Sequence, residues 1–147
     1  MAQAIAQRAV EVRGWDCVEI RSAGVSAYPG ALASEEARSV AVKAGLSLEE
    51  HRSSLLEAEL VKWADLILTM STHHLEVVER LGGKSKASML TAFATKLEED
   101  QEPEVPDPFG GDAEVYIESF RTIADLIETT LERVGREWGD PNGGEDS

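Results

Sequence analysis

The chain has 147 residues, of which 42% are hydrophobic, and this is enough for one domain with a sizeable core. Its formal net charge of −14 makes a surface that repels nucleic acid and anionic lipid, so neither is expected as a main partner. No apolar run reaches the roughly 18 residues of a membrane span, the first residues lack a signal peptide's apolar core, and the single cysteine, Cys17, allows no internal disulfide. These features favour a cytoplasmic protein.

Helices and strands are predicted to alternate along the chain. In chain order, the pattern predicts a helix at 1–13, a strand at 17–20, a helix at 34–44, short helices at 47–50 and 57–63, a strand at 65–70, a helix from 71 or 72 to 82, a short strand at 87–92 and a long helix from 112 or 113 to about 136. This alternation is typical of an α/β domain with a parallel sheet.

Local signals support several of these elements. Ser34 can cap the second helix, and Ser47 begins a capping-box pattern with Glu50. The compact apolar run 65–70 is of the kind buried in a parallel sheet. The last predicted helix has an apolar side along its whole length.

Two segments have the composition of irregular structure. Residues 94–112 are acidic and contain three prolines, and a loop of this length inside a compact domain is more often functional than idle. Residues 139–147 are polar and glycine-rich, which predicts a disordered tail. We therefore expect one folded domain over residues 1–138.

Four short segments, in this order and at this spacing, resemble the low-molecular-weight phosphotyrosine phosphatase family. They are Ile20-Arg21-Ser22-Ala23-Gly24-Val25, His51-Arg52-Ser53-Ser54-Leu55-Leu56, Ala64-Asp65-Leu66-Ile67-Leu68-Thr69-Met70 and Val105-Pro106-Asp107-Pro108-Phe109-Gly110-Gly111. The Asp-Pro-Phe-Gly-Gly form is similar to the bacterial branch that includes protein-arginine phosphatases. The resemblance covers roughly residues 1–137.

The resemblance implies a three-layer, doubly wound parallel sheet of the phosphotyrosine phosphatase I type, with strand order 2-1-3-4. Family members begin with an apolar strand that leads into a Cys-x5-Arg-Ser/Thr loop, whereas these 147 residues begin with Met-Ala, just beyond such a loop. Composition alone favours a helix that simply starts the protein. With the resemblance, we expect the first, central strand and the loop to be missing, through a misplaced start codon or a genuine truncation.

The family's chemistry needs an anion-binding loop, a cysteine thiolate that forms a phosphoenzyme, an arginine that clamps the phosphate, and a general acid. It needs no metal or organic cofactor. The resemblance places the general acid at Asp107, although an Asp-Pro turn without function is the plain alternative. The nucleophile and the arginine are absent, so we expect this chain to be inactive. A non-catalytic remnant that binds a partner is the other hypothesis.

The resemblance implies a phosphorylated protein, on tyrosine or arginine, or a small phosphoester as substrate. Phe109 either lines the mouth of the substrate pocket or packs on the core. His51 either supports the catalytic loop or is a structural histidine.

Cys17 has three residues, not five, before Arg21, so we expect a buried or half-buried side chain and not a nucleophile. The adjacent His73 and His74 are poorly spaced for one metal.

Loss of a central strand would also weaken the fold. The strands on either side would keep unpaired backbone groups where burial is expected, and each such group costs about 1–3 kcal/mol. Because a typical domain is stable by only about 5–15 kcal/mol, we expect the chain alone to be poorly stable or to aggregate.

Overall fold

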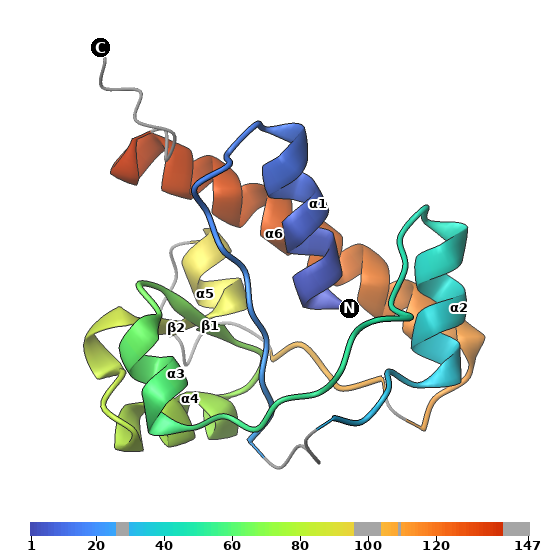
Figure 1. Cartoon of the computed structure of the whole chain (residues 1–147), viewed down its shortest axis with the longest axis horizontal. Helices are drawn as coiled ribbons and strands as arrows, with labels where there is room; N and C mark the ends of the chain where they lie inside the picture. The colour runs from blue at the N-terminus through green and yellow to red at the C-terminus, as the bar shows by residue number, and fades with distance from the viewer. Residues whose placement is uncertain (26–29, 96–103, 109, 140–147) are drawn as a thin grey trace.

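The computed structural model describes residues 1–25, 30–95, 104–108 and 110–139. Its elements are α1 (Ala2–Val12), α2 (Glu35–Lys43), α3 (Ala58–Trp63), β1 (Ile67–Thr69), α4 (Thr72–Arg80), the 3-10 turn η1 (Lys84–Lys86), β2 (Ala87–Met89), α5 (Leu90–Thr95) and α6 (Ala113–Trp138). Figure 1 shows the two strands between α5 and α6 on one side and α3 and α4 on the other. The predicted α/β arrangement is confirmed for these residues.

Short polar side chains start three of the helices. The hydroxyl of Ser34 accepts a hydrogen bond from the Ala37 amide, and the hydroxyl of Ser71 accepts one from the His74 amide. The carboxylate of Asp112 likewise accepts from an amide in the first turn of α6. Each cap satisfies an amide that has no partner inside its helix, which is why these predicted starts are confirmed.

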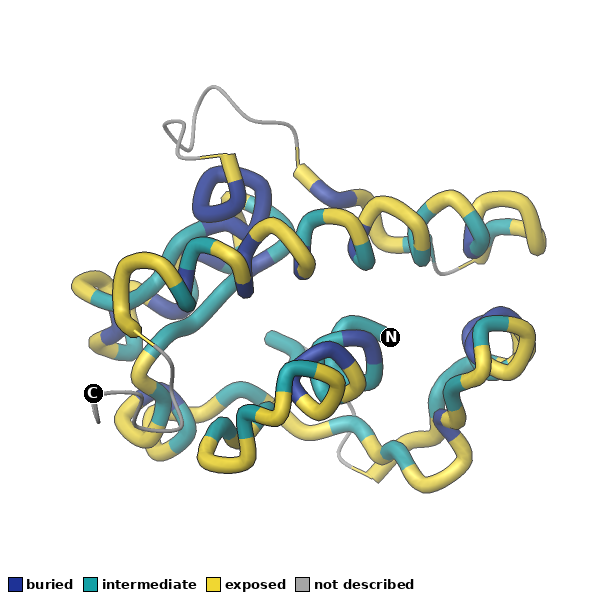
Figure 2. Tube along the Cα trace, turned by 90° about the horizontal axis from the view of Figure 1, so that it is seen from above, coloured by how far each residue is buried: buried dark blue, intermediate teal, exposed yellow. Residues whose placement is uncertain are grey.

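The sheet in the described part of the chain is a parallel pair. β1 lies beside β2 with Ile67 opposite Ala87 and Thr69 opposite Met89. Both strands are in contact with α4 and with α5. The predicted strand 87–92 is correct only in its first half, because the chain turns into α5 at Leu90. Figure 2 shows α5 as mostly buried, and all five residues from Leu90 to Ala94 are buried.

The predicted strand at 17–20 is wrong for this structure. Within the described residues, no ladder includes segment 17–23, and its one neighbouring pairing is an isolated bridge between Gly24 and Leu55. A strand is stabilised by a neighbour that takes up its backbone hydrogen bonds, and in the described part of the chain no strand pairs with this segment. The predicted helix at 47–50 is also absent: Ser47 accepts a hydrogen bond from the Glu49 amide in a simple turn.

The main core lies between α1 and α6, which are in contact with each other, and Figure 1 shows α1 crossing in front of α6. Its buried members come from α1, α5, α6 and the segment before Asp107, and they are Ile5, Ala9, Val10, Leu90, Val105, Ile123, Ile127 and Leu131. A second cluster joins α2 to Tyr116 at the start of α6. Because α6 contributes residues to both clusters, it connects the part of the molecule around α1 and α5 with the part around α2.

Within the described residues, no helix is long and apolar enough to cross a membrane. The predicted disordered tail, apart from Gly139, lies outside the described residues.

Candidate active site

The segment that carries Asp107 is attached to the carboxyl end of β1. The amide of Val105 donates a 2.8 Å hydrogen bond to the carbonyl of Met70, which directly follows that strand. The Val105 side chain is buried, with 6% of its surface exposed, in the core between α1 and α6. In α/β folds, ligands bind outside the carboxyl ends of the parallel strands. Asp107 is therefore held at the edge where a site is expected.

The end of the segment after Asp107 is also held in place by hydrogen bonds. The amide of Gly111 donates to the carbonyl of Pro108 at 2.8 Å, and Asp112 then caps α6. A Cβ atom on Gly111 would lie 2.8 Å from Val115 Cγ1 and 3.0 Å from the Pro108 oxygen, so only glycine fits this turn. Asp107 itself is exposed. The sequence thus anchors both ends of the segment and leaves Asp107 exposed between them.

The start of α1 lies against the same core. Met1 is half-buried and packs on both hydrophobic clusters, including the one that contains Val105. Burial lowers the pKa of the Met1 amino group below its usual 8.0. Gln3 links the helix to the neighbouring irregular segment, since its amide nitrogen donates to the Ile20 carbonyl at 3.4 Å and its amide oxygen accepts from the Ser22 hydroxyl at 2.7 Å.

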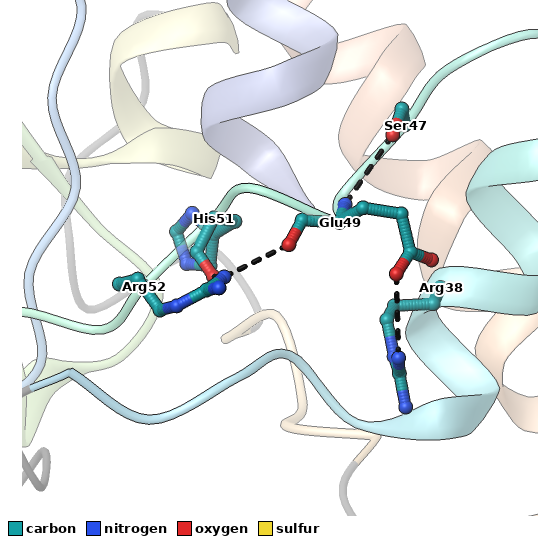
Figure 3. A network of polar contacts seen from close by, with 5 residues as sticks. All are labelled: Arg38, Ser47, Glu49, His51 and Arg52. Carbon is teal, nitrogen blue, oxygen red and sulfur yellow. Dashed lines mark hydrogen bonds and ion pairs between the residues drawn. The ribbon is translucent and has the colours of Figure 1, made fainter.

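His51 lies close to this helix start. Burial, the positive charge of the amino terminus and the charge of Arg52 all lower its pKa from the ordinary 6.5. Figure 3 shows the loop that holds it: the Arg52 guanidinium donates to the carbonyls of Glu49 at 2.8 Å and His51 at 2.9 Å. In the same network, Arg38 pairs with the Glu49 carboxylate at 3.5 Å. His51 therefore lies on a loop that is stabilised by hydrogen bonds between its own residues.

A cavity of about 570 Å³ opens between α1, the segment around Ser22 and the loop of His51. Its lining includes Gln3, Ser22, His51 and Arg52, and it extends to α3. Asp107 does not line it. The structure thus leaves space beside the first turn of α1, where helix amides favour an anion.

The lowered pKa values of His51 and Met1 predict a pH-dependent stability. Between the folded pKa and the unfolded value, the unfolded chain binds more protons, so stability falls as the pH falls. The loss should begin below about pH 8 through the Met1 amine and continue below about pH 6.5 through His51. Urea unfolding followed from about pH 8.5 to about pH 5 measures it.

Replacement His51→Gln separates the two contributions. The variant should lose part of the dependence below about pH 6.5 and keep the part at higher pH. An identical pH profile for the variant and the parent would show that His51 titrates alike in the folded and unfolded chains.

Cys17 lies apart from these groups. Its side chain is exposed, which corrects the expected burial, and it does not line the cavity beside α1. The rings of the adjacent His73 and His74 have centroids 5.9 Å apart, with their planes tilted by 52°. Among the residues that the structure describes, no three potential metal ligands gather. Phe109 lies outside the described residues.

One contact was missed by the sequence analysis. Glu104, which lies in the acidic segment 94–112, accepts a 2.8 Å hydrogen bond from the amide of Thr72, the first residue of α4. The signal for this contact is weak in sequence, because an acidic residue amid other acidic residues looks like solvated surface.

A family model described as low molecular weight phosphotyrosine protein phosphatase matches residues 1–138. A curated protein-arginine-phosphatase of Geobacillus stearothermophilus is 38% identical over 119 residues, which are 80% of this chain and 74% of the relative. A protein-arginine-phosphatase of Bacillus subtilis is 30% identical over 139 residues, 93% of this chain and 89% of the relative. The tyrosine phosphatase Wzb of Escherichia coli is 33% identical over 121 residues, 82% of this chain and 74% of the relative.

Solved structures agree with these matches. One is the arginine phosphatase YwlE as a cysteine-to-serine mutant with a phosphorylated active-site serine; it has a TM-score of 0.84 at 28% identity, covering 92% of this chain and 87% of that one. YwlE of Geobacillus stearothermophilus has a TM-score of 0.80 at 33% identity, covering 92% and 84%. The fold of the described residues is therefore that of these enzymes.

Proposed function

This chain belongs to the low molecular weight phosphotyrosine protein phosphatase family, and from that premise we propose that it supplies the general acid of a cytoplasmic phosphatase. In this proposal, Asp107 protonates the leaving oxygen or nitrogen of a phosphotyrosine, a phosphoarginine or a small phosphoester, and then activates the water that releases phosphate. The observation that carries it is the attachment of the segment before Asp107 to the carboxyl end of β1.

The nucleophile, in this proposal, comes from residues outside the given sequence. The 147 residues contain one cysteine and no Cys-x5-Arg stretch. In one similar structure, the phosphoryl group is on a serine that replaces a cysteine in the active site. A strand and loop of the family type, placed between segment 17–23 and β1 in the order 2-1-3-4, would bring such a cysteine to the first turn of α1. The cavity next to His51 and Gln3 supports this placement, with His51 as support for the loop.

In the proposed chemistry, the first turn of α1 and the arginine of the loop interact with the phosphate in different ways. Backbone amides at the first turn of α1 would stabilise the phosphate and hold the cysteine as a thiolate. A planar guanidinium would hold two phosphate oxygens. Phe109 would line the mouth of the substrate pocket. Neither a metal nor an organic cofactor takes part.

An extended protein tests the proposal. In it, an apolar strand and a Cys-x5-Arg-Ser loop from a family member precede Met1. We expect the chain as given to hydrolyse para-nitrophenyl phosphate and phosphoarginine at background rates, and the extended protein to turn over at least one of them. A loop cysteine replaced by serine in the extended protein is the matched control, because it keeps the shape and removes the nucleophile.

Two results would contradict the proposal. Turnover by the chain as given, abolished by Cys17→Ser, would make Cys17 the nucleophile. A folded but inactive extended protein would favour the alternative, a binding protein without catalysis.

A further inference from the structure

Two adjacent residues join the segment of Asp107 to the junction between β1 and α4. The Glu104 carboxylate accepts from the Thr72 amide at 2.8 Å, and the Val105 amide donates to the Met70 carbonyl at 2.8 Å. The two bonds lie on either side of Ser71, the residue that caps α4. Together they fix both the position and the direction of the chain three residues before Asp107.

We propose that Glu104 is a positioning residue for Asp107, and that its carboxylate at the start of α4 sets where the general acid points. This inference rests on the proposed function of Asp107 as the acid. Glu104 itself would not touch the substrate. Its part is to hold one end of a short segment of which the other end is already fixed by the turn between Pro108 and Gly111.

The chemistry of the contact suits this task. A carboxylate at a helix amino terminus accepts a charge-assisted hydrogen bond and interacts favourably with the helix dipole. Ser71 takes the amide of His74, so the amide of Thr72 remains available to Glu104. Both partners are exposed, so salt should weaken the contact.

The backbone between the anchor and the acid has little freedom. Pro106 and Pro108 flank Asp107, each proline fixes its own φ, and each restricts the residue before it. Val105 is buried and cannot move without opening the core. A shift at Glu104 would therefore be passed on to Asp107 rather than absorbed. A misplacement of about 1 Å at a catalytic group can cost on the order of 10²-fold in rate.

The contact can be measured on the chain as given. The Thr72 amide should exchange slowly with solvent while the Glu104 carboxylate accepts its hydrogen bond. Replacement Glu104→Ala should speed hydrogen exchange, followed by NMR, at the Thr72 and Val105 amides, whereas Glu104→Gln, whose amide oxygen can still accept, should keep exchange slow. Glu114→Ala, an exposed glutamate in the first turn of α6, is the matched control. Unchanged exchange at both amides in Glu104→Ala would overturn the proposal.

The positioning role is measured in the extended protein. Proton donation matters most for a poor leaving group, so Glu104→Ala should lower kcat on phenyl phosphate by on the order of 10-fold and on para-nitrophenyl phosphate by less than about twofold. Glu104→Gln should restore most of the rate. Equal losses on both substrates would indicate general destabilisation and would overturn the proposal. If the parent extended protein is inactive, the proposed function has failed, and Glu104 then has no acid to position.

Discussion

Asp107→Ala in the extended protein should lower kcat on phenyl phosphate by about 10²–10⁴-fold, the usual cost of removing one acid–base group. In the proposed mechanism this carboxyl donates a proton to the departing oxygen, so without it the phenolate would leave with its full charge. The loss should be smaller on para-nitrophenyl phosphate, because its leaving group is stable as an anion. Steady-state kinetics on the two substrates measures the difference.

Asp107→Asn and Glu114→Ala serve as controls for this result. The asparagine keeps the size of the side chain and cannot donate the proton, so it should be as impaired as the alanine variant. The Glu114→Ala variant should keep the parent rate. A kcat for Asp107→Ala within twofold of the parent on phenyl phosphate would remove Asp107 from the mechanism. In the chain as given, which has no nucleophile in this account, Asp107→Ala should change nothing measurable.

The extended protein should also be several kcal/mol more stable than the chain as given. β1 pairs with β2 alone in the described residues, and segment 17–23 joins no ladder there. The side chains of Val18, Ile20, Leu68 and Met70 are only partly buried against the core. A strand between these segments would pair backbone groups worth about 1–3 kcal/mol each when buried without partners, and would cover the apolar side chains.

Urea unfolding of the two proteins, followed by circular dichroism, gives this difference directly. An extension of the same length with prolines in its strand is the control, because proline removes ladder donors. The chain as given should unfold at low urea with a broad transition, or aggregate. The stability argument would be wrong if the chain as given unfolded cooperatively with the stability of an ordinary domain, about 5–15 kcal/mol, and the extension added nothing.

The sequence predicted the elements whose signals are local. Ser34 and Ser71 cap helices where the pattern placed them, since a cap needs only its own side chain and the next turn. The start of α6 at Asp112 follows for the same reason. These three helix starts could therefore be read without knowing the rest of the fold, whereas the capping pattern that begins at Ser47 forms only a turn.

Elements that depend on partners were predicted less well. The alternating run at 17–20 has a strand pattern and forms none, because a strand needs a neighbour. The apolar run after Met89 fits a buried helix as well as a strand, and the chain forms α5 there. The contact of Glu104 with Thr72 joins residues 32 positions apart, so no local pattern shows it. Asp107 was singled out by family resemblance, since Asp-Pro alone marks only a turn.

The covalent intermediate gives the most direct measurement. Rapid quenching of each protein with a phosphorylated substrate, followed by mass spectrometry of its peptides, locates any phosphoryl group held on cysteine. We expect one phosphoryl group on the loop cysteine of the extended protein, accumulating further in Asp107→Ala if hydrolysis of the intermediate becomes slow, and none on the chain as given. A phosphoryl group on Cys17 in the chain as given would contradict the account.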